Sequence, residues 1–309
     1  MTSRASAPGK IILFGEHAVV YGRPALAIPV TQVQTNAGVS VSARPGVWIE
    51  AADIDLHAEL GALPLGHPLA AVIRNLFASL GVDPYPNLRI CVSSTIPVAS
   101  GLGSGAAASV ALLRSLSSFL GKPLKDEDVN KQALEVEKLY HGSPSGIDNT
   151  VITYAKPVYF IKGKPTGIFR VGKPFTIVIG DTGMSTPTRE SVDDVRKLWD
   201  TDKTHWESVF DQVGWIVDEA RAEIESGQLD HLGELMNQNH SLLQEMTVSS
   251  PELDRLVDAA RKAGATGAKL SGGGRGGNMI ALVRPGSGDM VSQALINAGA
   301  KRTIVTQVQ

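Results

Sequence analysis

The sequence predicts an α+β protein built from two domains. Its 309 residues suffice for two packed domains or for one large α/β unit. Near residues 164–175, the stretch GKPTGIFRVGKP concentrates glycine, proline and lysine, which is typical of a connection between domains. Beyond it, strand-like and helix-like segments alternate to the end of the chain, as in a separate α+β domain. We therefore predict domains at residues 1–165 and 166–309.

The hydrophobic pattern predicts the individual elements. An apolar strand at residues 10–14 breaks at Gly15, and an amphipathic helix covers residues 67–80. Helix formers fill residues 106–120, whereas SPSGIDNTVITYAKPVYFIKG predicts a turn followed by strands. In the second half, four aromatic residues at helical spacing favour a core or a seam between helices over a base-stacking surface: Trp199, Trp206, Phe210 and Trp215.

Composition narrows the classes of partner. The chain is 43% hydrophobic and 19% charged, and its formal net charge of −2 gives no reason to expect nucleic acid or an anionic membrane. No apolar run approaches the roughly 20 residues that span a bilayer, and the N-terminus lacks the apolar core of a signal peptide. A single cysteine, Cys91, fits a reducing compartment, and its apolar surroundings predict a small buried core residue. We expect a cytoplasmic protein.

A glycine-rich loop at residues 96–113 (IPVASGLGSGAAASVALL) joins an extended segment to a helix. Its glycines allow close approach of a ligand, and the free N–H groups of the helix start bind anions. The loop formally fits the dinucleotide pattern G-x-G-x-x-G/A, but TIPVAS separates it from the strand, and no Gly-Lys-Ser/Thr follows. We interpret it as a phosphate cradle in which the Ser104 hydroxyl could reach a phosphate or a metal. The alternative is a tight turn with close helix packing.

Charged residues gather at two further places. Lys10 begins an apolar strand, and Glu16 and His17 follow it in a glycine-bounded turn, which suits a grip on a polar substrate. Glu137 and Asp148 flank a Ser-Pro-Ser-Gly turn that can bring the carboxylates together. One would then hold Mg²⁺ while the other takes a proton from a hydroxyl. Solvent-facing loop residues, a helix-surface glutamate and a structural Asx turn are the alternatives.

A second glycine cluster, SGGGRGG, lies between apolar segments near the end of the chain. Its flanks argue against a flexible linker and favour backbone packed against a ligand or another loop. With these blocks in order, the chain resembles the GHMP small-molecule kinases. The blocks are A-P-G-K-x-x-L-x-G-E-H, P-x-x-x-G-L-G-S-x-A-A and K-L-S-G-G-G-R-G-G, and together they span most of the sequence.

The resemblance implies a two-domain GHMP-kinase fold. Its N-terminal half would be like domain 2 of ribosomal protein S5 and its C-terminal half ferredoxin-like, with the active site in the cleft between them. It also implies ATP-dependent phosphorylation of a primary hydroxyl. Four further blocks resemble the branch that acts on mevalonate in isoprenoid precursor synthesis: GEHAVVYGRPALAIPV, EKLYHGSPSGIDNTV, DTG with TPTRESVDDVR, and MNQNHSLLQEMTVSSPELDRLV. The galactose and homoserine branches match less well, and the phosphomevalonate branch is the nearest alternative.

Matching positions carry the family's roles. Asp148 would activate the hydroxyl with help from Lys10, and Glu137 would hold Mg²⁺ together with Ser104. The remaining roles are substrate binding by Glu16, His17, Ser145 and Thr188, and ATP phosphate binding by Gly101, Leu102, Gly103, Ser104, Gly105 and Ala106. Dimers are common in the family. The alternative from another class, a non-catalytic nucleotide sensor, would be expected to lack the lysine or the carboxylates.

Two positions depart from the family pattern. The glycine loop usually has a second serine where this chain has Gly105, so that Ser104, a water or Glu137 with the phosphates would hold the metal. The last block has Arg275 and Asn278 where many members have glycine and cysteine. Arg275 could contact a phosphate or form a structural ion pair.

Overall fold

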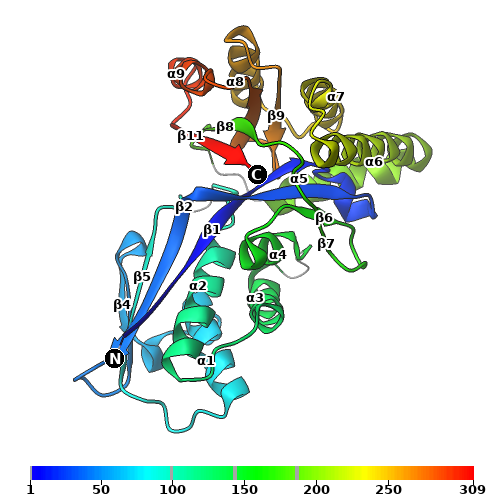
Figure 1. Ribbon diagram of the computed structural model, residues 1–309. Coiled ribbons are helices and arrows are strands. Elements are labelled where there is room, and N and C mark those ends of the chain that lie inside the picture. Colours follow the sequence, from blue (N-terminus) through cyan, green and yellow to red (C-terminus); the bar gives the residue numbers. More distant parts are fainter. Residues whose placement is uncertain (1, 98–99, 142–144, 185–187) are drawn as a thin grey trace. The chain divides into compact units, whose positions relative to one another are not determined.

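The computed structural model describes residues 2–97, 100–141, 145–184 and 188–309, and Figure 1 shows their arrangement into helices and strands. The chain folds into two compact units. The first consists of Met1–Lys10, Pro29–Val98 and Leu102–Ala155, and the second of Ile11–Ile28, Ala99–Gly101 and Lys156–Gln309. Each unit is therefore built from three segments that are not contiguous in the sequence. The domain boundary expected between residues 165 and 166 stays a prediction.

The first unit contains a mixed sheet in which β4 (Leu56–Glu59), β3 (Val47–Ala51), β5 (Leu88–Ser94) and β2 (Ala25–Val41) are neighbours in that order. Strand β1 (Thr2–Phe14) pairs with β2. Strand β5 runs antiparallel to β2 and parallel to β3. Two short 3₁₀ turns, η2 (Ala52–Ile54) and η3 (Leu60–Ala62), flank β4.

Strand β5 corrects the prediction for Cys91. Its residues alternate between buried and exposed, with Leu88, Ile90 and Val92 facing the core. Because side chains of a strand point to opposite faces in turn, Cys91 lies on the other face. It is exposed there, 3.5 Å from the carboxylate of Glu50, so the prediction of a buried core cysteine was wrong.

Helices of the first unit contact one another: α1 (Pro68–Leu80), α2 (Ser104–Phe119), α3 (Asp126–His141) and α4 (Ile147–Tyr154). The predicted helices at residues 67–80 and 106–120 are confirmed by α1 and α2. Helix α2 buries a stripe of alanine and leucine side chains and also contacts β5. Figure 1 shows α2 between α1 and α4.

Helix α4 lies where the sequence predicts a turn leading into strands, so that prediction was wrong. Its residues IDNTVITY include five β-branched side chains, whose weak helix propensity disfavours a helix. Local hydrogen bonds override this preference. Asn149 Nδ2 donates to Oδ1 of Asn130 on α3 at 2.5 Å, and Thr150 Oγ1 donates to Gly146 O at 2.7 Å. These contacts fix the start of α4, where Asp148 lies.

The second unit contains an antiparallel sheet with the strand order β11 (Arg302–Val308), β8 (Phe175–Asp181), β10 (Asn278–Val283) and β9 (Gly267–Ser271). Counted along the chain, this order is fourth, first, third, second, which is that of a ferredoxin-like sheet. Three helices contact its strands: α7 (Leu232–Glu245), α8 (Pro251–Lys262) and α9 (Gly288–Asn297). The expectation of a ferredoxin-like C-terminal half is confirmed.

The first residues of β2 belong to this unit and pair with β6 (Val158–Phe160), and β6 pairs with β7 (Gly167–Ile168). Helices α5 (Thr188–Thr201) and α6 (Lys203–Ser226) contact each other, and α6 contacts the 3₁₀ helix η1 (Ala18–Tyr21). Trp206 and Phe210 are buried on α6, as predicted for a core or seam, but Trp215 is 56% exposed and that prediction was wrong. Among the helices in these described stretches, none is long and apolar enough to cross a membrane.

Candidate active site

The predicted site residues fall into two groups, one in each unit. The first unit holds Lys10, Leu102 to Ala106, Glu137, Ser145 and Asp148. The second holds Gly101, Glu16 and His17. Thr188 begins α5, but its side chain lies outside the part of the chain that the structure describes.

Lys10 and Asp148 form an ion pair in the first unit. Lys10 Nζ lies 2.9 Å from Asp148 Oδ1, with side-chain exposures of 7% and 33%. Asp148 is the second residue of α4, where the free N–H groups and the helix dipole favour a negative charge. Ser145 stands just before the helix, is exposed, and accepts a hydrogen bond from Ile147 N at 3.3 Å. The pair therefore holds a carboxylate in place while leaving part of it open to a ligand.

The glycine loop packs directly against this lysine. Lys10 N donates to Leu102 O at 3.0 Å. Gly103 has φ 76°, and a Cβ there would lie 2.7 Å from Ile152 Cδ1 and 3.0 Å from Lys10 Cγ. Both the backbone conformation and the space exclude a side chain at Gly103. At Gly105, by contrast, a Cβ would meet nothing within 4 Å, so packing does not explain the glycine.

The start of α2 suits an anion, as the sequence predicts. Gly103 precedes the helix without a side-chain cap, and the first helical bond in this turn runs from Ala107 N to Gly103 O. The amides of Ser104, Gly105 and Ala106 therefore lack intrahelical partners and point along the positive end of the dipole. Together with the Lys10 ammonium, they give this end of the first unit hydrogen-bond donors and positive charge that suit a phosphate-like group, and phosphate binding here stays a prediction.

Glu137 lies on α3 in an environment unfavourable to its charge. Burial, followed by the negative charge of Asp148, raises the pKa of Glu137 to about 8, although Lys10 acts in the opposite direction. The two carboxylates are thus close enough to interact, as the sequence predicts. A divalent cation would relieve the repulsion between them. Within the described ranges, no group of three or more histidine, cysteine or acidic side chains could hold a metal without help from a ligand.

In the second unit, Glu16 and His17 are both buried. Lys269 Nζ on β9 binds Glu16 Oε1, and this lysine is itself fully buried. His17 Nε2 lies 3.1 Å from Gly273 O, so that nitrogen carries the hydrogen. Burial lowers the pKa of His17 to about 4, which keeps its imidazole neutral near pH 7. Sequence reasoning missed Lys269, whose only signal is a lysine within an apolar strand.

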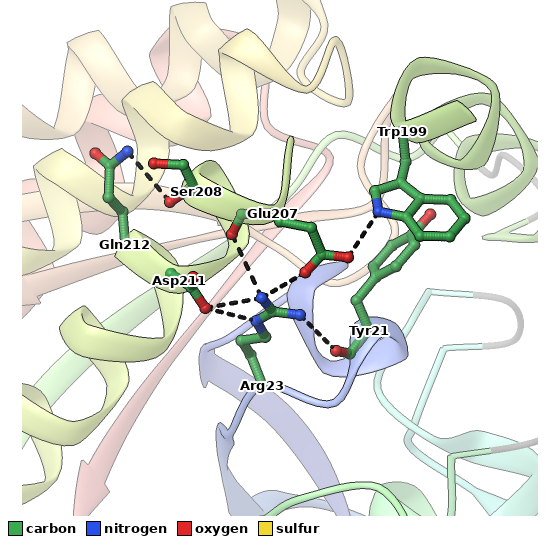
Figure 2. Close-up of polar contacts among 7 residues, drawn as sticks. All are labelled: Tyr21, Arg23, Trp199, Glu207, Ser208, Asp211 and Gln212. Atoms are coloured by element: carbon green, nitrogen blue, oxygen red, sulfur yellow. Dashed lines mark hydrogen bonds and ion pairs between the residues drawn. The ribbon is translucent and has the colours of Figure 1, made fainter. Parts of the chain in front are cut away.

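The loop that carries Glu16 and His17 is anchored by Arg23 (Figure 2). Its guanidinium binds Asp211 Oδ1 through Nε and Nη2 at 3.0 and 2.8 Å and Glu207 Oε2 at 2.5 Å, and Nη1 donates to Tyr21 O at 2.8 Å. Tyr21 stacks on Phe210, with ring centroids 4.1 Å apart. These contacts fix the end of η1 to α6. The sequence gives no local signal for them, because the acidic partners are more than 180 residues away.

Trp199 extends this anchor from α6 to α5. Its indole Nε1 donates to Glu207 Oε1 at 2.8 Å, and its ring lies 5.6 Å from that of Tyr21 (Figure 2). Glu207 therefore links Arg23 and Trp199 through its two carboxylate oxygens. Helix α5 begins at Thr188, so the same cluster holds two segments that carry predicted substrate-binding residues.

Replacing Arg23 by glutamine should destabilise the protein, because two carboxylates would lose a guanidinium whose side chain is only 19% exposed. We expect the free energy of unfolding to fall by about 2 kcal/mol. Chemical denaturation would measure it, with Arg189→Gln as the control. Arg189 is 90% exposed and lies 3.7 Å from Asp193, so its loss should change the stability by less than about 0.5 kcal/mol. Equal effects of the two substitutions would contradict the anchoring role of Arg23.

The second glycine cluster is fixed by its two unusual residues. Arg275, with φ 57°, forms an ion pair with Asp194 on α5 at 2.5 Å. The structure thus shows the ion pair that the sequence left as one of two alternatives. Asn278 Nδ2 donates to Ser100 O at 2.5 Å, next to Gly101. The cluster therefore supports the first residues of the glycine loop from within the second unit.

Comparisons with known proteins agree with this geometry. A family model for the GHMP kinases N terminal domain matches residues 67–156, and one for the GHMP kinases C terminal matches residues 220–301. The chain belongs to the GHMP kinases, and the predicted two-domain fold of that family is confirmed. Within it, the chain is 37% identical to the mevalonate kinase of Pyrococcus horikoshii over 96% of its own length and 92% of that protein. This places it in the mevalonate kinase branch of the family.

Solved structures support the same placement. The crystal structure of L. major mevalonate kinase in complex with R-mevalonate is 30% identical, with a TM-score of 0.87 over 100% of this chain and 96% of that one. A Streptococcus pneumoniae phosphomevalonate kinase in complex with phosphomevalonate and AMPPNP has a TM-score of 0.82 over 98% of this chain and 99% of that one. At 16% identity, it shows a shared fold only.

Proposed function

We propose that this protein transfers the γ-phosphoryl group of ATP to the primary hydroxyl of (R)-mevalonate, giving 5-phosphomevalonate. Membership of the mevalonate kinase branch supports the substrate. The observation that carries the chemistry is the ion pair between Lys10 and Asp148, packed against the glycine loop at Gly103. A non-catalytic sensor would have no need of a partly exposed carboxylate beside a buried lysine and an anion-binding helix start.

In the proposed reaction, Asp148 accepts the proton of the attacking hydroxyl. Lys10 stabilises the carboxylate and the negative charge that develops on the transferred group. The amides of residues 101–106 hold the triphosphate. Phosphoryl transfer depends mostly on positioning and charge neutralisation, and these residues supply both.

Glu137 is proposed to hold Mg²⁺. Its unfavourable environment fits a bound cation, and Mg²⁺ in kinases is commonly bound by one or two carboxylates together with phosphate oxygens and water. Ser104 is proposed as a further contact, and the open space at Gly105 leaves room for a water in place of the usual serine hydroxyl. When bound, the metal would neutralise phosphate charge.

Glu16, His17, Ser145 and Thr188 are proposed to bind the substrate. A phosphorylated substrate would call for additional cations in this set. Arg23, the cation nearest to the loop of Glu16 in sequence, is committed to Glu207 and Asp211, and Lys269 is committed to Glu16. These pairings favour mevalonate over phosphomevalonate. A cytoplasmic location and a homodimer stay predictions.

Release of ADP from Mg²⁺-ATP would test the function directly. Purified protein would be offered mevalonate, phosphomevalonate, galactose and homoserine in parallel. We expect mevalonate to be turned over with the highest kcat/KM. Equal or greater turnover of another substrate would refute the proposed specificity, and absence of turnover with all four would refute the proposed activity.

A further inference from the structure

A fully buried lysine on β9 contacts a residue proposed to bind the substrate. Lys269 is 0% exposed, and its Nζ binds Glu16 Oε1 and donates to Leu270 O at 2.7 Å. Burial lowers the pKa of Lys269, while the charge and hydrogen bond of Glu16 act in the opposite direction. The charge of Glu16 therefore offsets part of the cost of burying the Lys269 ammonium ion.

The second oxygen of Glu16 is the unusual feature of this pair. Glu16 is 2% exposed, and its Oε2 has no hydrogen-bond partner among the residues that the structure describes. A buried carboxylate oxygen without a donor is costly, and native proteins rarely keep one without a reason. A donor supplied by a ligand would satisfy it.

Stability alone does not explain why the chain keeps the pair. Both charges lose their hydration on burial, and well-packed apolar residues in place of such a pair often leave stability unchanged or increase it. Lys269 also lies between the apolar residues Ala268 and Leu270 on a fully buried strand. Because burying both charges costs free energy, the pair is better explained by a ligand that Glu16 Oε2 binds.

Among the ionisable groups near Glu16, the two histidines are neutral near pH 7 and Lys269 contacts the carboxylate. The imidazoles of His17 and His240 both have a pKa lowered to about 4 by burial, so neither is charged near pH 7. Arg275 acts on His17, while Arg261 and Asp254 act on His240. Lys269 is the cation in direct contact with the Glu16 carboxylate.

We propose that Lys269 is a positioning residue for Glu16. It commits Oε1 to an ion pair and thereby presents Oε2 as an acceptor for a hydroxyl group of the small-molecule substrate. The inference rests on the proposed function, because it assigns Lys269 to the substrate rather than to ATP. Lys269 acts only through Glu16 and does not itself contact the substrate.

A double-mutant cycle tests this dependence. The wild type would be compared with Lys269→Met, Glu16→Gln and the double variant, measuring kcat, KM for mevalonate, KM for ATP and Tm. Each single substitution should raise KM for mevalonate on the order of tenfold, the effect of one hydrogen bond, and leave KM for ATP within about twofold. The double variant should match Glu16→Gln, because the lysine has no carboxylate left to position. Lys262→Met, on the exposed side of α8, is the control and should leave every value unchanged.

Two results would overturn the proposal. One is a double variant whose KM for mevalonate rises about 100-fold, which would mean that Lys269 contacts the substrate independently. The other is a Lys269→Met protein with the wild-type KM for mevalonate. If Lys269→Met alone does not fold, the comparison of Glu16→Gln with the double variant still tests whether Lys269 contacts the substrate independently, since removing both charges leaves no uncompensated buried ion.

Failure of the proposed function would be seen separately, in the wild type. If the wild type prefers another substrate of the panel, the same four proteins would be measured with that substrate. A matched KM in Glu16→Gln and the double variant would then still support positioning by Lys269, and multiplying effects would still overturn it.

Discussion

Replacing Asp148 by asparagine should abolish measurable phosphoryl transfer while leaving the affinity for ATP nearly unchanged. Asparagine keeps the shape of the side chain and can still accept a hydrogen bond from Lys10 Nζ, 2.9 Å away in the wild type. It cannot accept the proton of the attacking hydroxyl. A general base contributes about 10²–10⁴-fold, so we expect kcat to fall by roughly 10³-fold or more. ADP release would give kcat, and calorimetric titration would give the dissociation constant of ATP.

A matched substitution separates this effect from a general loss of carboxylate. Asp128→Asn changes an exposed residue in the first turn of α3, in the same unit, and should keep wild-type turnover. Thermal denaturation would show whether both variants fold. If Asp148→Asn kept more than about a tenth of the wild-type kcat, Asp148 would not be the base. If it lost ATP binding as well, the ion pair with Lys10 would serve chiefly to shape the phosphate loop.

The sequence marks Lys10 and Asp148 as candidate site residues because the signal is local in each case. Lys10 starts an apolar strand, and Asp148 follows a Ser-Pro-Ser-Gly turn, so each is recognisable from its neighbours. That they meet at 2.9 Å could not be predicted from spacing, since 137 residues separate them. The family resemblance supplied that expectation. Their catalytic roles stay proposals until turnover is measured.

The contacts that support the loop of Glu16 and His17 were missed because they join distant segments. Arg23 lies in a loop beside α6, and Lys269 pairs with Glu16 across 253 residues. In both cases, the sequence presents an isolated cation with no recognisable partner nearby. Helix α4 was missed for the opposite reason. Its β-branched residues predict strand locally, and hydrogen bonds to Asn130 on another helix decide the outcome.

The pKa of Glu137 should make kcat/KM for Mg²⁺-ATP depend on pH. Because its pKa is raised to about 8, Glu137 of the free enzyme is largely protonated at pH 6–7. A protonated carboxyl does not bind Mg²⁺, so metal binding must release a proton. We expect kcat/KM for Mg²⁺-ATP to rise with pH, reach half of its limiting value near pH 8 and level off above it. Glu137→Gln should lower kcat/KM by roughly 100-fold or more and remove this rise.

The free energy of unfolding should change in the opposite direction and fall as the pH rises. This fall distinguishes the titration of Glu137 from that of other groups. The unfolded chain loses the Glu137 proton near its ordinary pKa of about 4.3, whereas the folded state keeps it up to about 8. The folded state binds more protons in this window, so the contribution of Glu137 is present at low pH and is lost as the pH rises to about 8. Glu137→Gln does not titrate, and its Tm should therefore exceed that of the wild type increasingly from pH 5 to 8. Asp148→Asn, which removes a charge that raises this pKa, should shift the window downward. A constant difference in Tm between Glu137→Gln and the wild type across this range would show that Glu137 does not hold a proton in the folded protein.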